Sequence, residues 1–157
     1  SAPELPEYEL RSVSGGVLVQ SPDAVNDDPA TWTVASSAQP TPEQLQQAGF
    51  AWKVCAAVSS NAIVVTQNNE AVGIGGGQQN RLDAARLACE RAGTRAIGGV
   101  AASDAFFPFR DGLDMLATAG VHVVVEPGGS VRDEEVIAAA NEHGIVLIFT
   151  GARHFRH

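Results

Sequence analysis

The chain has 157 residues, of which 45% are hydrophobic, and its formal net charge is −8. This length suits one compact domain with a sizeable core. The acidic balance argues against nucleic acid as the main partner, because a polyphosphate backbone would be repelled. No apolar run reaches the roughly 20 residues of a membrane span, and residues 1–4 lack the pattern of a signal peptide. We therefore expect a cytoplasmic protein with no membrane partner.

The first 40 residues predict an extended segment with one short strand, residues 16–20, and then a polar connection rich in Asp, Pro and Ser. A helix is predicted next, with Thr41 as its N-cap, Pro42 at its first position and Gln44 placed to complete a capping box. The apolar run 62–66, the turn Asn68-Asn69 and the run 70–74 together predict a β-hairpin.

The remainder of the chain predicts strands that alternate with helices. Helices are expected at 81–91, 112–119 and 131–143, and strands at 98–102, 121–125 and 145–149. This order is typical of an α/β fold with largely parallel pairing in the second half. We expect a single domain over residues 1–157. Cys55 and Cys89 lie among apolar residues and are expected to be buried thiols, and no Cys/His cluster has the spacing of a metal site.

Two features predict an anion site. Gly73-x-Gly75-Gly76-Gly77 precedes the helix at 81–91, so it could either cradle a phosphate or form a plain tight turn. Its spacing is not that of a dinucleotide-binding motif. Arg81 starts that helix and Arg153 lies near the C-terminus, and a guanidinium can hold two phosphate oxygens. The alternative for Arg153 is a solvated basic tail.

The run Ser103-Asp104-Ala105-Phe106-Phe107-Pro108-Phe109-Arg110-Asp111 predicts a loop, because Pro108 suits neither a helix interior nor a central strand. Flat rings beside carboxylates suit a planar heterocycle, although the rings could instead fill the core. Asp104 could contact such a ligand, or it could equally cap or turn the loop. Asn61 is either an ordinary asparagine at a strand edge or a ligand contact. His122 and His143 are interpreted as structural, whereas His154 and His157 lie close in sequence to Arg153.

Several segments resemble the C-terminal part of the AICAR transformylase domain in the bifunctional purine biosynthesis family (AICAR transformylase / IMP cyclohydrolase). They occur in the family's order and are Glu9 to Gly16, Phe50 to Val54, Ser60 to Val64, Val72 to Arg81, and the Phe-rich loop. The resemblance implies a cytidine-deaminase-like layered α/β fold with a mixed, largely parallel sheet. It also implies formyl transfer to aminoimidazole carboxamide ribotide during IMP biosynthesis, with 10-formyltetrahydrofolate as cosubstrate.

The resemblance also implies roles for six residues. Asn61 would orient the formyl group and the carboxamide, while Arg81 and Arg153 would hold the nucleotide phosphate. Phe106 and Phe109 would stack on the imidazole and folate rings, and Asp111 would bond the pterin. The catalytic Lys-His pair of the family lies upstream of this region; here Lys53 is the only lysine and no Lys-His dipeptide occurs. The implied partners are a second copy or the remainder of the transformylase. The alternative is a non-catalytic nucleotide- or folate-binding module.

Overall fold

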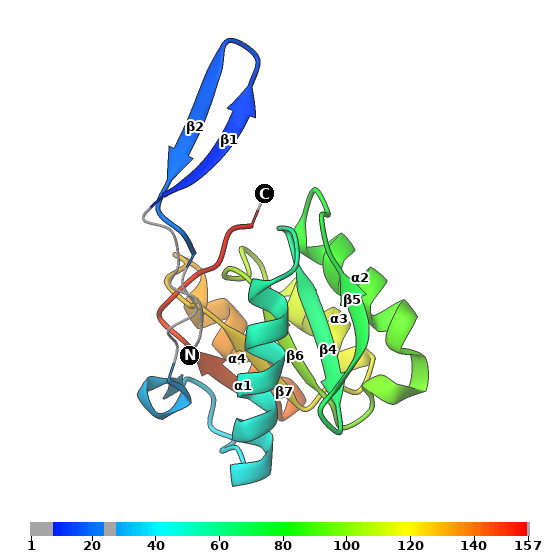
Figure 1. Ribbon diagram of the computed structural model, residues 1–157. Helices are drawn as coiled ribbons and strands as arrows, with labels where there is room; N and C mark the ends of the chain where they lie inside the picture. Colours follow the sequence, from blue (N-terminus) through cyan, green and yellow to red (C-terminus); the bar gives the residue numbers. More distant parts are fainter. Residues whose placement is uncertain (1–7, 24–27, 157) are drawn as a thin grey trace.

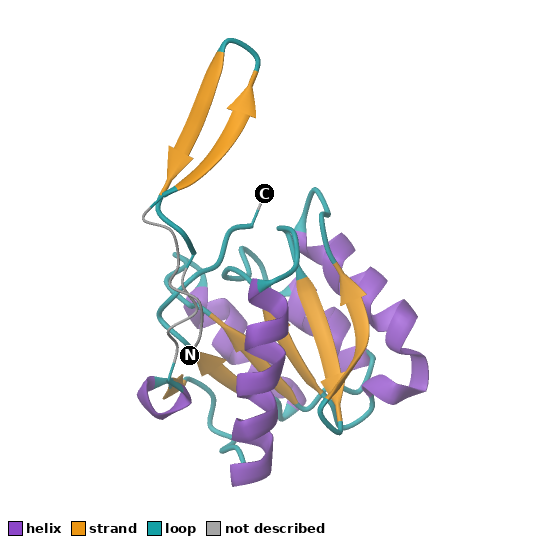
Figure 2. Cartoon of the chain, viewed as in Figure 1, coloured by secondary structure: helices purple, strands orange, loops and turns teal. Residues whose placement is uncertain are grey.

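The computed structural model describes residues 8–23 and 28–156, and its centre is a mixed six-stranded sheet in the order β3-β8-β7-β6-β4-β5 (Figures 1 and 2). The strands β6, β7 and β8 pair in parallel, and the other three pairings are antiparallel. The predicted α/β fold with a mixed sheet is confirmed, and parallel pairing is confined to the second half of the chain. The sheet is not largely parallel as expected, because three of its five pairings are antiparallel. The strands are β3 (Thr33–Val34), β4 (Ile63–Gln67), β5 (Glu70–Gly75), β6 (Val100–Ser103), β7 (Val123–Glu126) and β8 (Val146–Phe149).

Helices cover both faces of this sheet (Figure 1). The helix α1 (Pro42–Ala56) packs on one face, and α2 (Arg81–Ala92), α3 (Asp111–Thr118) and α4 (Asp133–His143) pack on the other. Alternation along β4 explains the two layers, because Val64 faces the α1 side with Trp52 whereas Ile63 and Val65 face the α2 side. Two short 3₁₀ helices, η1 (Pro29–Thr31) and η2 (Gly93–Ala96), complete the described elements of the body.

Local sequence signals account for the helix boundaries. The capping box at the start of α1 is formed as predicted, since Thr41 Oγ1 accepts from the Gln44 amide at 3.2 Å and Gln44 Oε1 accepts from the Thr41 amide at 2.9 Å. Gly144 ends α4 with a φ of 69°, a left-handed conformation that favours glycine.

The glycine run has a packing explanation. A Cβ added at Gly73 would lie 2.0 Å from the carbonyl oxygen of Ala88, and one at Gly75 would lie 2.0 Å from that of Ala84. Strand β5 therefore lies directly on the backbone of α2, and only glycine permits this approach. The first two glycines of the run are accordingly required by helix–strand contact, whatever binds nearby.

A two-stranded hairpin projects from the body (Figure 1). It consists of β1 (Glu9–Val13) and β2 (Gly16–Gln20), and every residue of the two strands is exposed. The strand 16–20 matches its predicted bounds. The prediction of one strand in the first 40 residues is wrong, because β1 and β3 also form. Strand β3 has only two residues and forms by pairing with β8. The local sequence cannot predict this pairing, because β8 is distant along the chain.

Chain segments that are distant in sequence meet along one edge of the sheet, the edge formed by the carboxyl ends of the parallel strands. Because β4 runs antiparallel to β6, Ile63 at the start of β4 pairs with Ser103 at the end of β6. The parallel strands β7 and β8 end at this same edge, and β5 leads from it into α2. This is the edge at which α/β sheets commonly bind ligands. In the described part of the chain, no helix has the length and apolar character needed to cross a membrane.

Candidate functional site

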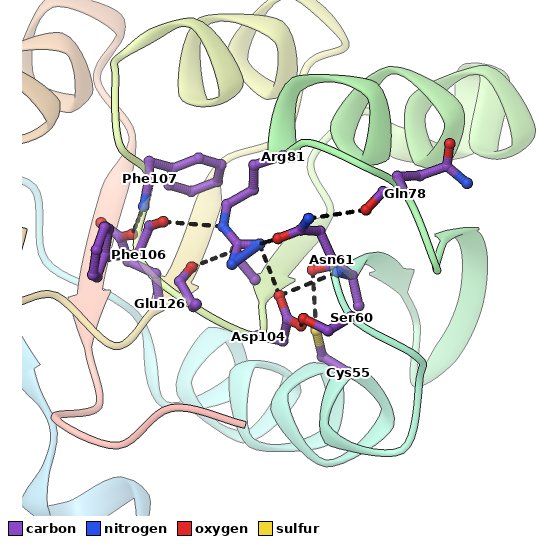
Figure 3. Close-up of polar contacts among 12 residues, drawn as sticks. Cys55, Ser60, Asn61, Gln78, Arg81, Asp104, Phe106, Phe107 and Glu126 are labelled. Atoms are coloured by element: carbon purple, nitrogen blue, oxygen red, sulfur yellow. Dashed lines mark hydrogen bonds and ion pairs between the residues drawn. The ribbon is translucent and has the colours of Figure 1, made fainter. Parts of the chain in front are cut away.

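A buried ion pair joins the start of α2 to the end of β6 (Figure 3). Arg81 Nη1 lies 2.9 Å from Asp104 Oδ1, and the two side chains are 7% and 1% exposed. Asp104 also accepts hydrogen bonds from the Ala62 amide at 3.1 Å and from the Ser60 hydroxyl. Burial lowers the pKa of the Arg81 guanidinium, and the charge of Asp104 opposes this effect. The pair is therefore an internal structural centre of the site.

The same guanidinium orients Asn61 and the Phe-rich loop (Figure 3). Arg81 Nη1 donates to Asn61 Oδ1 at 2.9 Å, and Arg81 Nε donates to the Phe106 carbonyl oxygen at 3.0 Å. The amide nitrogen of Asn61 donates to the Gln78 carbonyl at 2.9 Å. Both ends of the Asn61 amide are thus held, which leaves one N–H and one oxygen lone pair for a ligand.

Two adjoining cavities contain all six residues predicted for the site. The larger cavity, of about 360 Å³, is lined by Asn61, Arg81, Phe106 and Arg153, together with Gln79, Asn80, Ala105, Pro108 and Phe155. The smaller cavity, of about 280 Å³, is lined by Phe109 and Asp111, together with Asn80, Arg81, Leu82, Asp83 and Pro108. Asn80, Arg81 and Pro108 border both cavities.

The three rings of the Phe-rich loop separate into different roles. Phe107 is 1% exposed and packs over Gly112, where an added Cβ would lie 2.6 Å from the ring. Phe106 is half-buried in the larger cavity, and Phe109 is 49% exposed with the Arg132 guanidinium 4.8 Å from its centroid. One ring therefore fills the core, and two remain accessible to a ligand.

The C-terminal residues form one side of the larger cavity. The His154 amide donates to the Asp104 carbonyl at 2.9 Å, and the Ser60 amide donates to the Arg156 carbonyl at 2.8 Å. Directly before the first of these attachments, the exposed Arg153 guanidinium lies 5.2 Å from the Phe155 ring centroid. Within residues 8–23 and 28–156 Arg153 makes no ion pair. The segment is thus attached to the body, and its cation is available to an anion.

The His154 side chain, between the cavity-lining residues Arg153 and Phe155, makes its contacts within the protein. The His154 side chain is 4% exposed, its Nδ1 lies 2.8 Å from Asp23 Oδ1, and its ring centroid is 4.9 Å from that of Trp52. These contacts fit a packing role for His154. His157 lies outside the described residues.

Two carboxyl groups of the site were not assigned to it from sequence. The sequence leaves Asp104 open between capping and ligand binding, and it does not distinguish Glu126, which is 0% exposed at the end of β7. Burial raises the pKa of Glu126 to about 8. The signal that could have found both residues is an acidic residue directly after a buried apolar strand, at the carboxyl edge of the sheet.

Cys55 and Cys89 are buried free thiols, as predicted, and burial raises the pKa of each. Cys55 Sγ lies 3.4 Å from the Ala102 carbonyl oxygen, so it fills the α1 side of the core. Across the described residues there is no group of three or more His, Cys, Asp or Glu side chains that could hold a metal ion.

Comparison with known proteins identifies the family. The sequence model of the AICARFT/IMPCHase bienzyme family matches residues 1–91, more than half of the chain. The chain belongs to this family. Among its curated relatives, the bifunctional purine biosynthesis protein PurH of Mycobacterium leprae (strain Br4923) is 55% identical over 160 residues, covering 100% of this chain and 30% of that protein. PurH of Myxococcus xanthus (strain DK1622) is 54% identical over 151 residues, covering 96% of this chain and 29% of that protein. The family expected from the motifs is confirmed, and this AICARFT/IMPCHase family chain spans about 30% of the length of these relatives.

Solved structures show weaker similarity to this family member. Acinetobacter baumannii RibD, form 2, has a TM-score of 0.44 and 19% identity, covering 67% of this chain and 33% of that chain. A Thermotoga maritima diaminohydroxyphosphoribosylaminopyrimidine deaminase/5-amino-6-(5-phosphoribosylamino)uracil reductase has a TM-score of 0.36 and 18% identity over the same shares. The layered α/β architecture with a mixed sheet follows from the strand order itself.

Proposed function

We propose that this chain forms the nucleotide- and folate-facing part of an AICAR transformylase in purine biosynthesis. The reaction is formyl transfer from 10-formyltetrahydrofolate to the amine of aminoimidazole carboxamide ribotide. The observation that carries the proposal is the pair of adjoining cavities, which are lined by the six residues that the family resemblance assigns to the two substrates. The names of the curated relatives support the pathway.

The larger cavity suits the ribonucleotide. Arg153 offers a guanidinium that no described residue pairs, which can bind the phosphate through two hydrogen bonds. The Phe106 ring offers a flat apolar face for the imidazole. The remaining N–H and lone pair of Asn61 can bond the carboxamide and the formyl oxygen, which orients the acceptor toward the donor.

The smaller cavity suits the folate. The exposed Phe109 face can stack on a planar ring, and the Asp111 carboxylate can accept hydrogen bonds from pterin N–H groups. In the reaction the amine nitrogen attacks the formyl carbon, the bond from that carbon to folate N10 breaks, one proton leaves the amine, and one proton is added to the departing N10. The described residues offer no evident acceptor for the proton that leaves the amine. We propose that the Lys-His pair of another segment or chain supplies this proton acceptor.

Arg81 receives a different role from the one first expected. Its Nη1 and Nε are already bonded to Asp104, Asn61 and the Phe106 carbonyl. Three of its five N–H groups are thus used, and its charge is paired with Asp104, so only the Nη2 N–H groups remain for a phosphate. We assign the main phosphate contact to Arg153 and propose that Arg81 positions Asn61 and Phe106.

Substitution of Arg153 tests the nucleotide site. Arg153→Ala is expected to weaken binding of the ribotide about 10- to 100-fold, the effect of losing a charged bidentate hydrogen bond. Binding of the corresponding nucleoside should change little, because it has no phosphate. The measurement is isothermal titration calorimetry with both ligands.

The matched control is Arg156→Ala, because Arg156 lies three residues further along the same segment and borders a different, polar cavity. It should leave ribotide affinity within about twofold of the starting value. Equal losses for nucleotide and nucleoside in Arg153→Ala, or equal losses in the two variants, would remove Arg153 from the phosphate site.

The projecting hairpin predicts self-association. Leu10, Val17 and Val19 share one face because Leu10 pairs with Val19 and Ser12 with Val17, and they are 68%, 58% and 59% exposed. A two-stranded hairpin alone is marginally stable in water, so this face needs cover, and we propose a second copy of the chain as its occupant.

Sedimentation equilibrium at tens of micromolar should then show a homodimer, and the double substitution Leu10→Ser with Val19→Ser should give a monomer. Val131→Ser is the control, since Val131 is exposed and belongs to the loop between β7 and α4 and not to the hairpin. A monomeric parent chain would refute the association.

A further inference from the structure

The peptide group between Phe106 and Phe107 is held from both sides by buried charged side chains. Its carbonyl oxygen accepts from Arg81 Nε at 3.0 Å, and its N–H donates to Glu126 Oε2 at 2.7 Å. Arg81 is 8% exposed and Glu126 is 0% exposed. Figure 3 shows the guanidinium and the loop meeting at this peptide. Both polar groups of a single peptide plane are therefore bonded to side chains of other elements.

The orientation of this peptide determines where the two adjacent rings lie. Phe107 enters the core and packs over Gly112, whereas Phe106 lines the larger cavity. Rotation of the peptide plane would break both hydrogen bonds and would turn the Phe106 ring relative to the cavity. The bonds from Arg81 and Glu126 thus control the position of the ring that contacts the ligand.

Glu126 has an environment that opposes ionisation. Its Oε1 is buried and finds no hydrogen-bond partner among the described residues. Burial raises the pKa of Glu126 to about 8, and Asp133 of α4 adds to this effect, while the Phe107 amide and Arg81 of α2 act against it. Asp104 already neutralises Arg81, which limits the help that this cation can give. These contacts favour the neutral form of the Glu126 carboxyl up to a higher pH than for an exposed glutamate.

We propose that Glu126 is a positioning residue for the larger cavity, which together with Arg81 fixes the Phe106–Phe107 peptide and holds it more firmly when ionised. A charged acceptor makes a stronger hydrogen bond to the Phe107 amide than a neutral one. The proposal rests on the proposed function only in taking a ribonucleotide as the ligand of this cavity.

The first test needs no ligand. In ¹H–¹⁵N correlation spectra of the whole chain, the Phe107 amide proton is expected to move downfield as pH rises from 6 to 9.5, with its midpoint near the Glu126 pKa of about 8. Glu126→Gln keeps an oxygen acceptor but cannot ionise, so this transition should disappear. Glu134→Gln, an exposed neighbour on α4, should leave it unchanged. A Phe107 amide that does not titrate, or that titrates equally in Glu126→Gln, would overturn the proposal.

The second test measures ribotide affinity by calorimetry. At pH 9, where Glu126 is ionised, Glu126→Ala should weaken binding about tenfold, the effect of losing one hydrogen bond to a charged group. Glu126→Gln should stay within about twofold of the parent chain at pH 7 but lose the rise in affinity between pH 7 and 9. Equal affinity in all three proteins across this range would also overturn the proposal. If Glu126→Ala fails to fold, the pH dependence of ribotide affinity in Glu126→Gln still tests the proposal. If the parent chain binds no ribotide, the proposed function fails, while the spectra still decide the role of Glu126.

Discussion

Asp104→Asn is expected to lower the free energy of unfolding by about 3–5 kcal/mol, the range for breaking a buried ion pair at one partner. The variant leaves the Arg81 guanidinium buried without its counterion, at a position that is 7% exposed. It also weakens the acceptor for the Ala62 amide and the Ser60 hydroxyl. The measurement is urea denaturation followed by tryptophan fluorescence, since Trp52 lies in the α1 side of the core.

Two further variants distinguish the effect of the unpaired buried charge from a general loss of stability. The double variant Arg81→Met with Asp104→Asn removes both charges and should recover a large part of the loss. Glu90→Gln breaks the exposed pair with Arg86, whose side chains are 54% and 57% exposed, and should cost less than about 1 kcal/mol. If Asp104→Asn costs no more than Glu90→Gln, the pair does not hold the site together.

The regular elements of the body were predictable because their signals are local. Helix α2 begins at Arg81 as predicted and ends one residue beyond the predicted boundary, just before Gly93, which has a φ of 56°. Helix α4 ends at His143, directly before Gly144. A cap, a change of period and a left-handed glycine lie within a few residues of each other. Strand β1 and its register with β2 were missed, because polar and apolar residues are mixed on an exposed ribbon.

The site was predictable in its members but not in its internal contacts. Asn61, Phe106 and Arg153 do line one cavity. The direction of Arg81 could not be predicted, because its partner Asp104 lies 23 residues away and reaches it only when β6 has paired with β4. The same holds for Glu126, whose burial depends on β7 lying inside the sheet. A charged residue at a strand end is therefore ambiguous until its neighbours in the sheet are known.

The chain alone is expected to show essentially no formyl transfer with saturating ribotide and 10-formyltetrahydrofolate. General acid–base assistance is worth about 10²- to 10⁴-fold, and the correct positioning of the donor contributes further. This sequence has one lysine and no Lys-His dipeptide. His154, which lies between the cavity-lining residues Arg153 and Phe155, is buried against Trp52 and bonded to Asp23. The proton released by the attacking amine thus lacks an evident acceptor.

The measurement follows the consumption of 10-formyltetrahydrofolate, first with this chain and then after adding the upstream transformylase region of a family relative, which should carry the Lys-His pair. Restored turnover would support the transformylase function. Ribotide binding without turnover in the combined proteins would favour the non-catalytic binding module.

Turnover by the chain alone at about 1 s⁻¹ or more, an ordinary enzyme rate, would show that the base lies within these residues. His154→Gln and His157→Gln would then be compared to locate it, because both histidines follow Arg153 in the sequence.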